Sequence, residues 1–440
     1  MVGVGITLEG IHTNWVTNEA LLSQGWEFFV PHANAKENAS LNKWVQDFVS
    51  RRYNSGGNAT MLQSAWSRLA NFSTTSVYNG PRGNYFEGWG NTRSLVTRRP
   101  FWPLGEASGW GWNNDGTSDG FMGDAPRYDP RALLQALREL LSGAAAGESS
   151  SSLPTSLAVD VVDLCVTTMA NAWLVQLGGM INMTSGNMTS KKVAQIQALG
   201  AEMIAGIAVT DEVLASNENF LLGKWISDAK SWANKPWAFR SSSEKKEEES
   251  GEDEAALLEF NARNQVTMWG PPLFVGANPS RYGSPGSPQD YAAKTWAGLY
   301  GSFYLQRQQL FFNMLNDAAT EAVAVDAAPI DFVKLAPKFT NASVAFEVRW
   351  GASTSSEVFA STPTGNTFAL AAKAVETYGA IVDNATWCQI EYVGKLWYNV
   401  DKGGVMNFWV MSEFVDHLLH SNPNYYFSLV RCEGPAAGRI

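Results

Sequence analysis

The amino-acid sequence predicts a mainly α-helical protein, in which a large helical domain follows the last piece of a (β/α)8 barrel. Apolar residues recur at helical spacing over most of the chain, as in 41–48, where they fall at i, i+3, i+4 and i+7. Residues 2–8 instead alternate as in a strand that is apolar at every second position. This lone strand needs neighbours, and it leads directly to Glu9. An acid at the C-terminal end of a barrel strand lies on the catalytic face of a (β/α) barrel.

Three parts are expected in order. Residues 1–30 are the barrel remnant with the catalytic-face Glu9, residues 31–382 are the helical domain, and residues 383–440 are a tail of unknown role. The periodicity within the helical domain predicts helices near 131–142, 156–176, 190–207, 209–216, 218–233, 255–268, 288–318 and 366–378. Residues 328–352 are expected to be β-like or irregular, and Gly379 is expected to end the last helix.

Two segments have unusual composition. Residues 241–254 hold seven acids and two lysines, which predicts a solvated and disordered insertion. Residues 157–181 are rich in apolar side chains but carry Asp160 and Asp163. Because carboxylates are costly in lipid, we interpret this stretch as a buried amphipathic helix and expect no membrane span.

Composition excludes several classes of protein. The net charge is −10 and no basic cluster is present, which argues against a nucleic-acid partner and against an anchor on anionic lipid. Three cysteines exclude a disulfide scaffold. The first residues have neither the basic nor the apolar region of a signal peptide. Glycosylation sequons nevertheless suggest a secretory route; they occur at Asn38, Asn58, Asn71, Asn182, Asn187, Asn341 and Asn384.

A series of motifs makes the chain recognisable. The longest are GVGITLEGIHTN at 3–14, KWVQDFVSRRY at 43–53, DEVLASNENFLLGKW at 211–225 and FNARNQVTMWGP at 260–271. In this order they resemble the C-terminal part of the lysosomal-type α-N-acetylglucosaminidases, a family of retaining glycoside hydrolases. The resemblance spans roughly residues 3–380, and residues 383–440 match nothing in that family.

The resemblance implies that Glu9 is the nucleophile. Retaining glycosidases use two carboxyls about 5–5.5 Å apart, one as nucleophile and one as acid/base. The acid/base of the family lies upstream in the barrel. We therefore expect that an upstream barrel domain is needed, and that this chain alone is incomplete and inactive. No metal and no organic cofactor is expected.

Three further residues are candidates for substrate binding. Trp269 precedes Gly-Pro, which forces it out of the preceding helix, so that its indole can line a pocket mouth or cap the helical core. Asn14 keeps the residue of the family in the loop after Glu9 and can bind substrate, orient Glu9 or be an ordinary loop residue. The phenol of Tyr78, in SVYN, can reach a sugar hydroxyl.

The tail offers two further expectations. Glu413, His417 and His420 have the spacing of metal ligands on one helix face, but an ordinary polar face is the simpler interpretation. Cys388 and Cys432 both lie in the tail, and they are the expected disulfide pair if the protein enters an oxidising compartment.

The function implied by the resemblance is hydrolysis of terminal α-linked N-acetylglucosamine from glycans such as heparan sulfate, with retention. The full-length form is expected to be lysosomal or secreted. The alternative is a non-catalytic carbohydrate-binding or interaction protein derived from the same family.

Overall fold

The computed structural model confirms that the chain is mainly α-helical. It describes residues 19, 37–54, 57–70, 95–97, 100, 128–145, 153–233, 251–267, 294–354, 358–394, 404–411 and 426–435. Most of the expected barrel remnant, residues 1–30, lies outside the described residues, as do the spaced acid and histidines of the tail.

The described elements are ten α-helices, three short helical turns and three strands. The α-helices are α2 (Glu37–Tyr53), α3 (Ala59–Ala70), α5 (Pro130–Ala145), α6 (Thr155–Thr184), α7 (Ser190–Ala215), α8 (Leu222–Lys230), α9 (Gly251–Gln265), α10 (Leu305–Ala324), α11 (Phe332–Ala352) and α12 (Thr367–Asn384). The helical turns are η1 (Leu95–Thr97), η3 (Glu218–Phe220) and the π-helix η5 (Tyr300–Tyr304), and the strands are β1 (Trp387–Gly394), β2 (Gly404–Met411) and β3 (Tyr426–Glu433).

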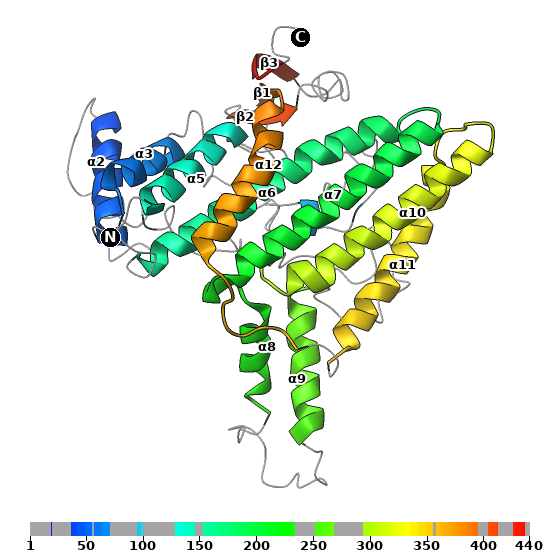
Figure 1. Cartoon of the computed structure of the whole chain (residues 1–440), viewed down its shortest axis with the longest axis horizontal. Helices are drawn as coiled ribbons and strands as arrows, with labels where there is room; N and C mark the ends of the chain where they lie inside the picture. Colours follow the sequence, from blue (N-terminus) through cyan, green and yellow to red (C-terminus); the bar gives the residue numbers. More distant parts are fainter. Residues whose placement is uncertain are drawn as a thin grey trace.

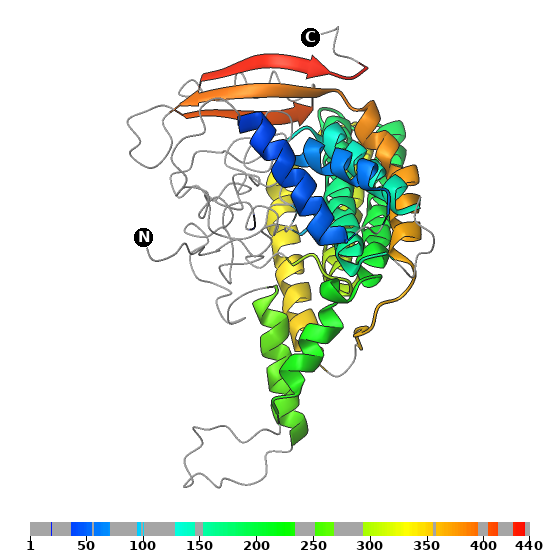
Figure 2. The same cartoon turned by 90° about the vertical axis from the view of Figure 1, so that its left-hand side faces the viewer.

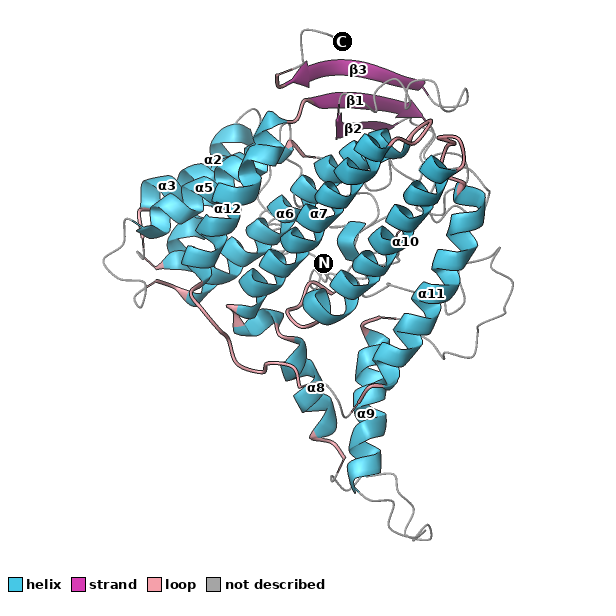
Figure 3. Cartoon of the chain, turned by 45° about the vertical axis from the view of Figure 1, so that its right-hand side comes forward, coloured by secondary structure: helices cyan, strands magenta, loops and turns pink. Residues whose placement is uncertain are grey.

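The long helices lie side by side in a row (Figure 1). Spatial neighbours follow the order α2, α3, α5, α6, α7, α10 and α11, and α12 packs on α5, α6 and α7. The paired helices α8 and α9 project from one edge of this row as an arm, and the sheet lies at the opposite edge (Figure 3).

Helix α6 is the centre of the core. Its side chains are apolar on nearly every side, and it packs on α5, α7 and α12. Helices α6 and α7 are both long and apolar enough to cross a membrane by length and composition alone. In α6, however, 78% of the most apolar window is buried inside the protein, which is the pattern of a core helix. Residues 157–181 are thus helical and buried as expected, although they are enclosed rather than amphipathic.

The three strands of the tail form an antiparallel sheet with the order β2-β1-β3 (Figure 2). Its attachment to the helices is through Trp387, which is fully buried and donates from Nε1 to the Val382 carbonyl over 3.1 Å. The expected disulfide is confirmed, because Cys388 pairs with Cys432 across β1 and β3 with their Cα atoms 4.0 Å apart. The tail therefore has its own sheet, a feature that the helical prediction did not include.

Residues 332–352 are helical, so the expectation of a β-like or irregular patch was wrong except at residues 328–331, where Pro329 forms an isolated antiparallel bridge with Asn187. Helix α11 runs through this stretch and contains Pro337, which disfavours a helix interior. Asp331 begins the helix by accepting a bond from the Lys334 backbone N–H over 3.1 Å. Leu335 and Phe339 are buried. Burial of the apolar face therefore outweighs the weak local propensity.

Two other helices are longer than the sequence predicted. Helix α7 continues without a break over residues 190–215, where two helices were expected. Helix α12 continues past Gly379 to Asn384. A Cβ at position 379 would lie 3.2 Å from an Arg138 side-chain nitrogen of α5, so this glycine permits close packing of two helices and does not end one.

The prediction for the acidic insertion was wrong for its last four residues. Residues 251–254 are the first turn of α9 and not a disordered segment. Residues 241–250 lie outside the described residues before that helix.

Candidate functional site

The four predicted site residues, Glu9, Asn14, Tyr78 and Trp269, all lie outside the described residues. The structure instead describes the residues that flank two segments outside the described part of the chain. One segment is 268–293, which carries Trp269, and the other is 98–99, which follows the η1 turn. Buried charged side chains hold both flanks.

A buried arginine holds the helix that leads to Trp269. Arg263 of α9 is fully buried and donates from Nε and Nη2 to Glu259 Oε1, over 2.9 and 2.7 Å. It also donates from Nη1 to the Trp350 carbonyl of α11 over 3.1 Å. Lys230 of α8 donates to the second Glu259 oxygen over 2.8 Å. Three helices are thereby joined at the base of the arm, at the start of the 268–293 segment.

Aromatic rings enclose the same guanidinium. The Arg263 carbon Cζ lies 4.9 Å from the centre of the Trp350 ring and 4.8 Å from that of Phe359. These cation–π contacts favour a charged, dehydrated guanidinium at this position.

A partly buried carboxylate holds the other end of the segment. Asp211 Oδ1, from the DEVLAS motif of α7, accepts bonds from the backbone N–H groups of Gly298 and Gly301 over 2.8 and 2.9 Å. A Cβ at position 301 would meet Asp211 Oδ2 at 2.8 Å, so the close approach requires glycine there. Burial raises the pKa of the Asp211 carboxyl above its ordinary value, and the two backbone donors oppose that rise. Asp211 therefore fixes the start of the long helix after the segment.

The η1 turn is held by two consecutive side chains of α10. Arg307 donates from Nη2 to the Thr97 carbonyl over 2.8 Å, and Gln308 donates from Nε2 to the Val96 carbonyl over 3.0 Å. Arg307 is paired with the buried Glu347 of α11 over 3.0 Å. The backbone just before Arg98 and Arg99 is thus fixed by the helical core.

The RRY motif at 51–53 also has a structural role. Arg52 donates two bonds to the fully buried Asp160 of α6, over 2.6 and 2.7 Å, and Tyr53 donates a third over 2.7 Å. Trp66 of α3 donates to the Tyr53 hydroxyl over 2.7 Å. This network joins α2, α3 and α6. Burial is also the largest cause of a raised pKa for the Asp160 carboxyl, and the bonds from Arg52 and Tyr53 oppose it.

These buried carboxylates are occupied by donors within the protein. Asp160, Asp211, Glu259 and Glu347 each accept bonds from arginines or backbone N–H groups. Their chemistry is to position helices. A signal for this was present in the sequence, since each is a charge within an apolar helical pattern.

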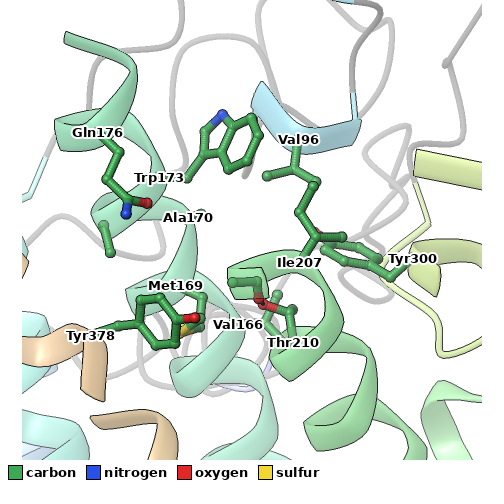
Figure 4. A pocket seen from close by; sticks show the side chains of 12 residues that line it. Val96, Val166, Met169, Ala170, Trp173, Gln176, Ile207, Thr210, Tyr300 and Tyr378 are labelled. Carbon is green, nitrogen blue, oxygen red and sulfur yellow. Dashed lines mark hydrogen bonds between the residues drawn. The ribbon is translucent and has the colours of Figure 1, made fainter. Parts of the chain in front are cut away.

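A small cavity lies between α6, α7, α12 and the η1 turn (Figure 4). Trp173, Gln176, Thr210 and Tyr378 are among its lining residues. Its volume is about 10 Å³, which is room for a single water molecule and not for a sugar ring. In the described part of the chain, no group of three or more His, Cys, Asp or Glu side chains could hold a metal ion.

Sequence comparison identifies relatives for most of the chain. The family profile of the alpha-N-acetylglucosaminidase (NAGLU) C-terminal domain matches residues 44–377. The human alpha-N-acetylglucosaminidase is 30% identical over 326 residues, which are 73% of this chain and 34% of the human protein.

Solved structures agree at the level of fold. A family 89 glycoside hydrolase from Clostridium perfringens, in complex with its substrate GlcNAc-alpha-1,4-galactose, is similar with a TM-score of 0.59 and 22% identity, over 86% of this chain and 35% of that one. The complex of the Clostridium perfringens family 89 enzyme with 2-acetamido-1,2-dideoxynojirmycin gives a TM-score of 0.57 at 20% identity, over 83% and 34%. The chain thus spans about a third of the length of these relatives.

Proposed function

This chain belongs to the alpha-N-acetylglucosaminidase family through its C-terminal domain. We therefore propose that it is the C-terminal portion of a retaining glycosidase. The substrates are terminal α-linked N-acetylglucosamine residues of glycans such as heparan sulfate. The observation that carries the proposal is the family match over residues 44–377, together with the buried anchors at both ends of the segment that carries Trp269.

The proposed chemistry assigns one step to this chain. The carboxylate of Glu9 attacks the anomeric carbon and forms a glycosyl-enzyme, while a second carboxyl protonates the leaving oxygen. Water then releases the sugar with net retention. The second carboxyl is assigned to a barrel domain N-terminal to the matched region, as in the family. Trp269, Asn14 and Tyr78 are proposed to contact the sugar.

We propose that the full-length form is lysosomal or secreted. Two features of the structure support a secretory route. The Cys388–Cys432 disulfide is typical of oxidising compartments. Five sequon asparagines of the described residues are exposed, as glycosylation requires; they are Asn58, Asn182, Asn187, Asn341 and Asn384.

The nucleophile is tested with a dinitrophenyl α-N-acetylglucosaminide. Its leaving group departs without protonation, so the assay does not need the acid/base, whose help is worth about 10²–10⁴-fold on poorer leaving groups. In the protein joined to the upstream barrel domain that the proposal requires, the expected result is release of dinitrophenolate that Glu9→Gln reduces to the buffer rate. Sodium azide added to Glu9→Ala should restore release by replacing the missing nucleophile, which a merely structural Glu9 would not allow.

Two outcomes contradict the proposal. Equal rates for the wild type and Glu9→Gln would show that Glu9 takes no part in the reaction. Binding of GlcNAc-α-1,4-galactose without any turnover that depends on Glu9 would favour the alternative, a non-catalytic carbohydrate-binding protein.

A further inference from the structure

Two tryptophans at the base of the arm have the geometry of a sugar-stacking platform. Among the described residues, few large apolar side chains are exposed, and Trp225 of α8 is one of them, at 37%. Its ring centre lies 5.9 Å from that of Trp296, and the two ring planes are inclined by 49°. Trp296 is itself only partly buried. An inclined pair of indoles therefore lies partly open to solvent.

The orientation of this pair is fixed by bonds to the backbone. Trp225 donates from Nε1 to the Ala262 carbonyl of α9 over 3.0 Å, which holds its ring plane against α9. Two backbone bonds hold residue 297, the neighbour of Trp296, beside the start of α8: Leu222 donates to the Ala297 carbonyl over 3.1 Å, and Ala297 donates to the Phe220 carbonyl over 2.7 Å. The platform is therefore preorganised, and a ligand would not need to order it.

A cation lies over one of the rings. Lys294 Nζ is 5.1 Å from the centre of the Trp296 ring, over its face. Its positive charge would attract the hydroxyl or carboxylate oxygens of a ligand that contacts the exposed part of the indole pair. Flat apolar faces next to a hydrogen-bond donor match a pyranose ring, which presents C–H groups on one face and hydroxyls around its edge.

We propose that Trp225 and Trp296, with Lys294, form a binding surface for a pyranosyl oligosaccharide, separate from Glu9. The choice of a glycan as ligand rests on the proposed function, whereas the preorganised indole pair stands without it. In a glycosidase such a surface holds further sugar units of the polymer while one terminal unit is cleaved.

The test is isothermal titration of the chain with chitotetraose. This neutral, β-linked probe removes ionic attraction and is not a substrate for an α-glycosidase. Trp225→Ala should weaken binding about five- to tenfold, the loss typical of a buried aromatic contact. Trp225→Phe keeps an aromatic face but loses the bond to Ala262, so its affinity should be intermediate. Trp232→Ala is the matched control, because Trp232 is also exposed, at 50%, and lies seven residues further along the arm.

The outcomes separate this surface from the catalytic proposal. Loss of affinity in Trp225→Ala and Trp296→Ala, with unchanged circular dichroism and unchanged dinitrophenolate release, supports the surface. Affinity within twofold of the wild type in both variants, an equal loss in Trp232→Ala, or no binding of chitotetraose by the wild type overturns it. Absence of hydrolysis that depends on Glu9 would leave the binding result intact.

Discussion

Neighbouring residues in this chain can contribute very different amounts to stability. Arg51 and Arg52 are adjacent in the RRY motif, yet their surroundings differ completely. The Arg51 side chain is 57% exposed and pairs with the exposed Glu19, whereas Arg52 forms a bidentate pair with Asp160, whose side chain is 1% exposed. An exposed pair contributes little, while removing one partner of a buried pair leaves a charge without compensation.

Arg52→Ala should therefore lower the free energy of unfolding by about 3–5 kcal/mol. Arg51→Ala, the control one residue away, should change it by less than about 1 kcal/mol. Urea denaturation followed by circular dichroism measures both. Similar losses for the two variants would show that the Arg52–Asp160 pair has no special weight.

The raised pKa of Asp211 predicts how the stability of the protein depends on pH. Burial raises its pKa in the folded protein above the unfolded value of about 3.9. The folded state then binds the proton more tightly than the unfolded chain, so this contribution favours folding at low pH and is lost as pH rises through the folded pKa. Asp211→Asn keeps an oxygen that can accept from Gly298 and Gly301 but cannot ionise. The stability of the wild type relative to Asp211→Asn should fall as the pH rises from the unfolded pKa of about 3.9 through the higher folded pKa.

Urea denaturation of the two proteins across that range is the measurement. Parallel stability curves would mean that Asp211 has the same pKa in the folded and unfolded states.

At the scale of elements, helix starts follow from local sequence and helix contacts do not. Thr189, Asp331 and Asn366 each cap a helix by accepting a bond from a backbone N–H three residues later, which is a pattern readable in the chain. Gly223 of α8 gives no such signal. A Cβ at that position would overlap the backbone carbonyls of Phe359 and Ala360, so only glycine allows this segment to cross α8.

Gly223→Ala should therefore destabilise the protein by about 1–3 kcal/mol, because backbone atoms must move apart. Gly179→Ala in α6 is the matched control. A Cβ there meets only the Leu199 side chain, at an ordinary 3.6 Å, so the higher helix propensity of alanine should stabilise by up to about 1 kcal/mol. Thermal melts compare the two, and a stable Gly223→Ala would show that residues 359 and 360 can shift without cost.

At the scale of the whole molecule, the sheet is attached to one edge of the helical row (Figure 3). Trp387 and Met411 are buried where the sheet meets the helices, and Arg131 of α5 is paired with Glu433 of β3 over 2.9 Å. The Cys388–Cys432 disulfide links β1 to β3, which are 44 residues apart in sequence. Packing and an ion pair thus attach the sheet to the helices, and the disulfide cross-links two strands within it.

The double variant Cys388→Ala/Cys432→Ala should lose about 2–4 kcal/mol of stability, since it removes a cross-link that restricts the unfolded chain. A reductant should lower the melting temperature of the wild type to that of the variant and leave the variant unchanged. A variant as stable as the wild type would show that the cross-link between β1 and β3 adds nothing to stability.

Much of the fold could be predicted from the sequence because helix formation depends on local patterns. The apolar repeats predicted α2, α5 and most of α6, and the paired tail cysteines predicted the disulfide. The interior of α11 contradicted its local pattern, because Pro337 and β-branched residues suggested no helix. The predicted site residues lie outside the described residues, and the buried anchors beside them were not predicted.

The chain by itself determined the helical content and the family, since both follow from the order of residue types along it. Only the tertiary structure decided which partners the buried charges have. Arg52 meets Asp160 across 108 residues, and Asp211 meets Gly298 and Gly301 across 87 and 90. The physical reason is range: periodicity and caps act over a few residues, whereas a buried charge is stable only beside the partner that the packing of distant helices brings to it.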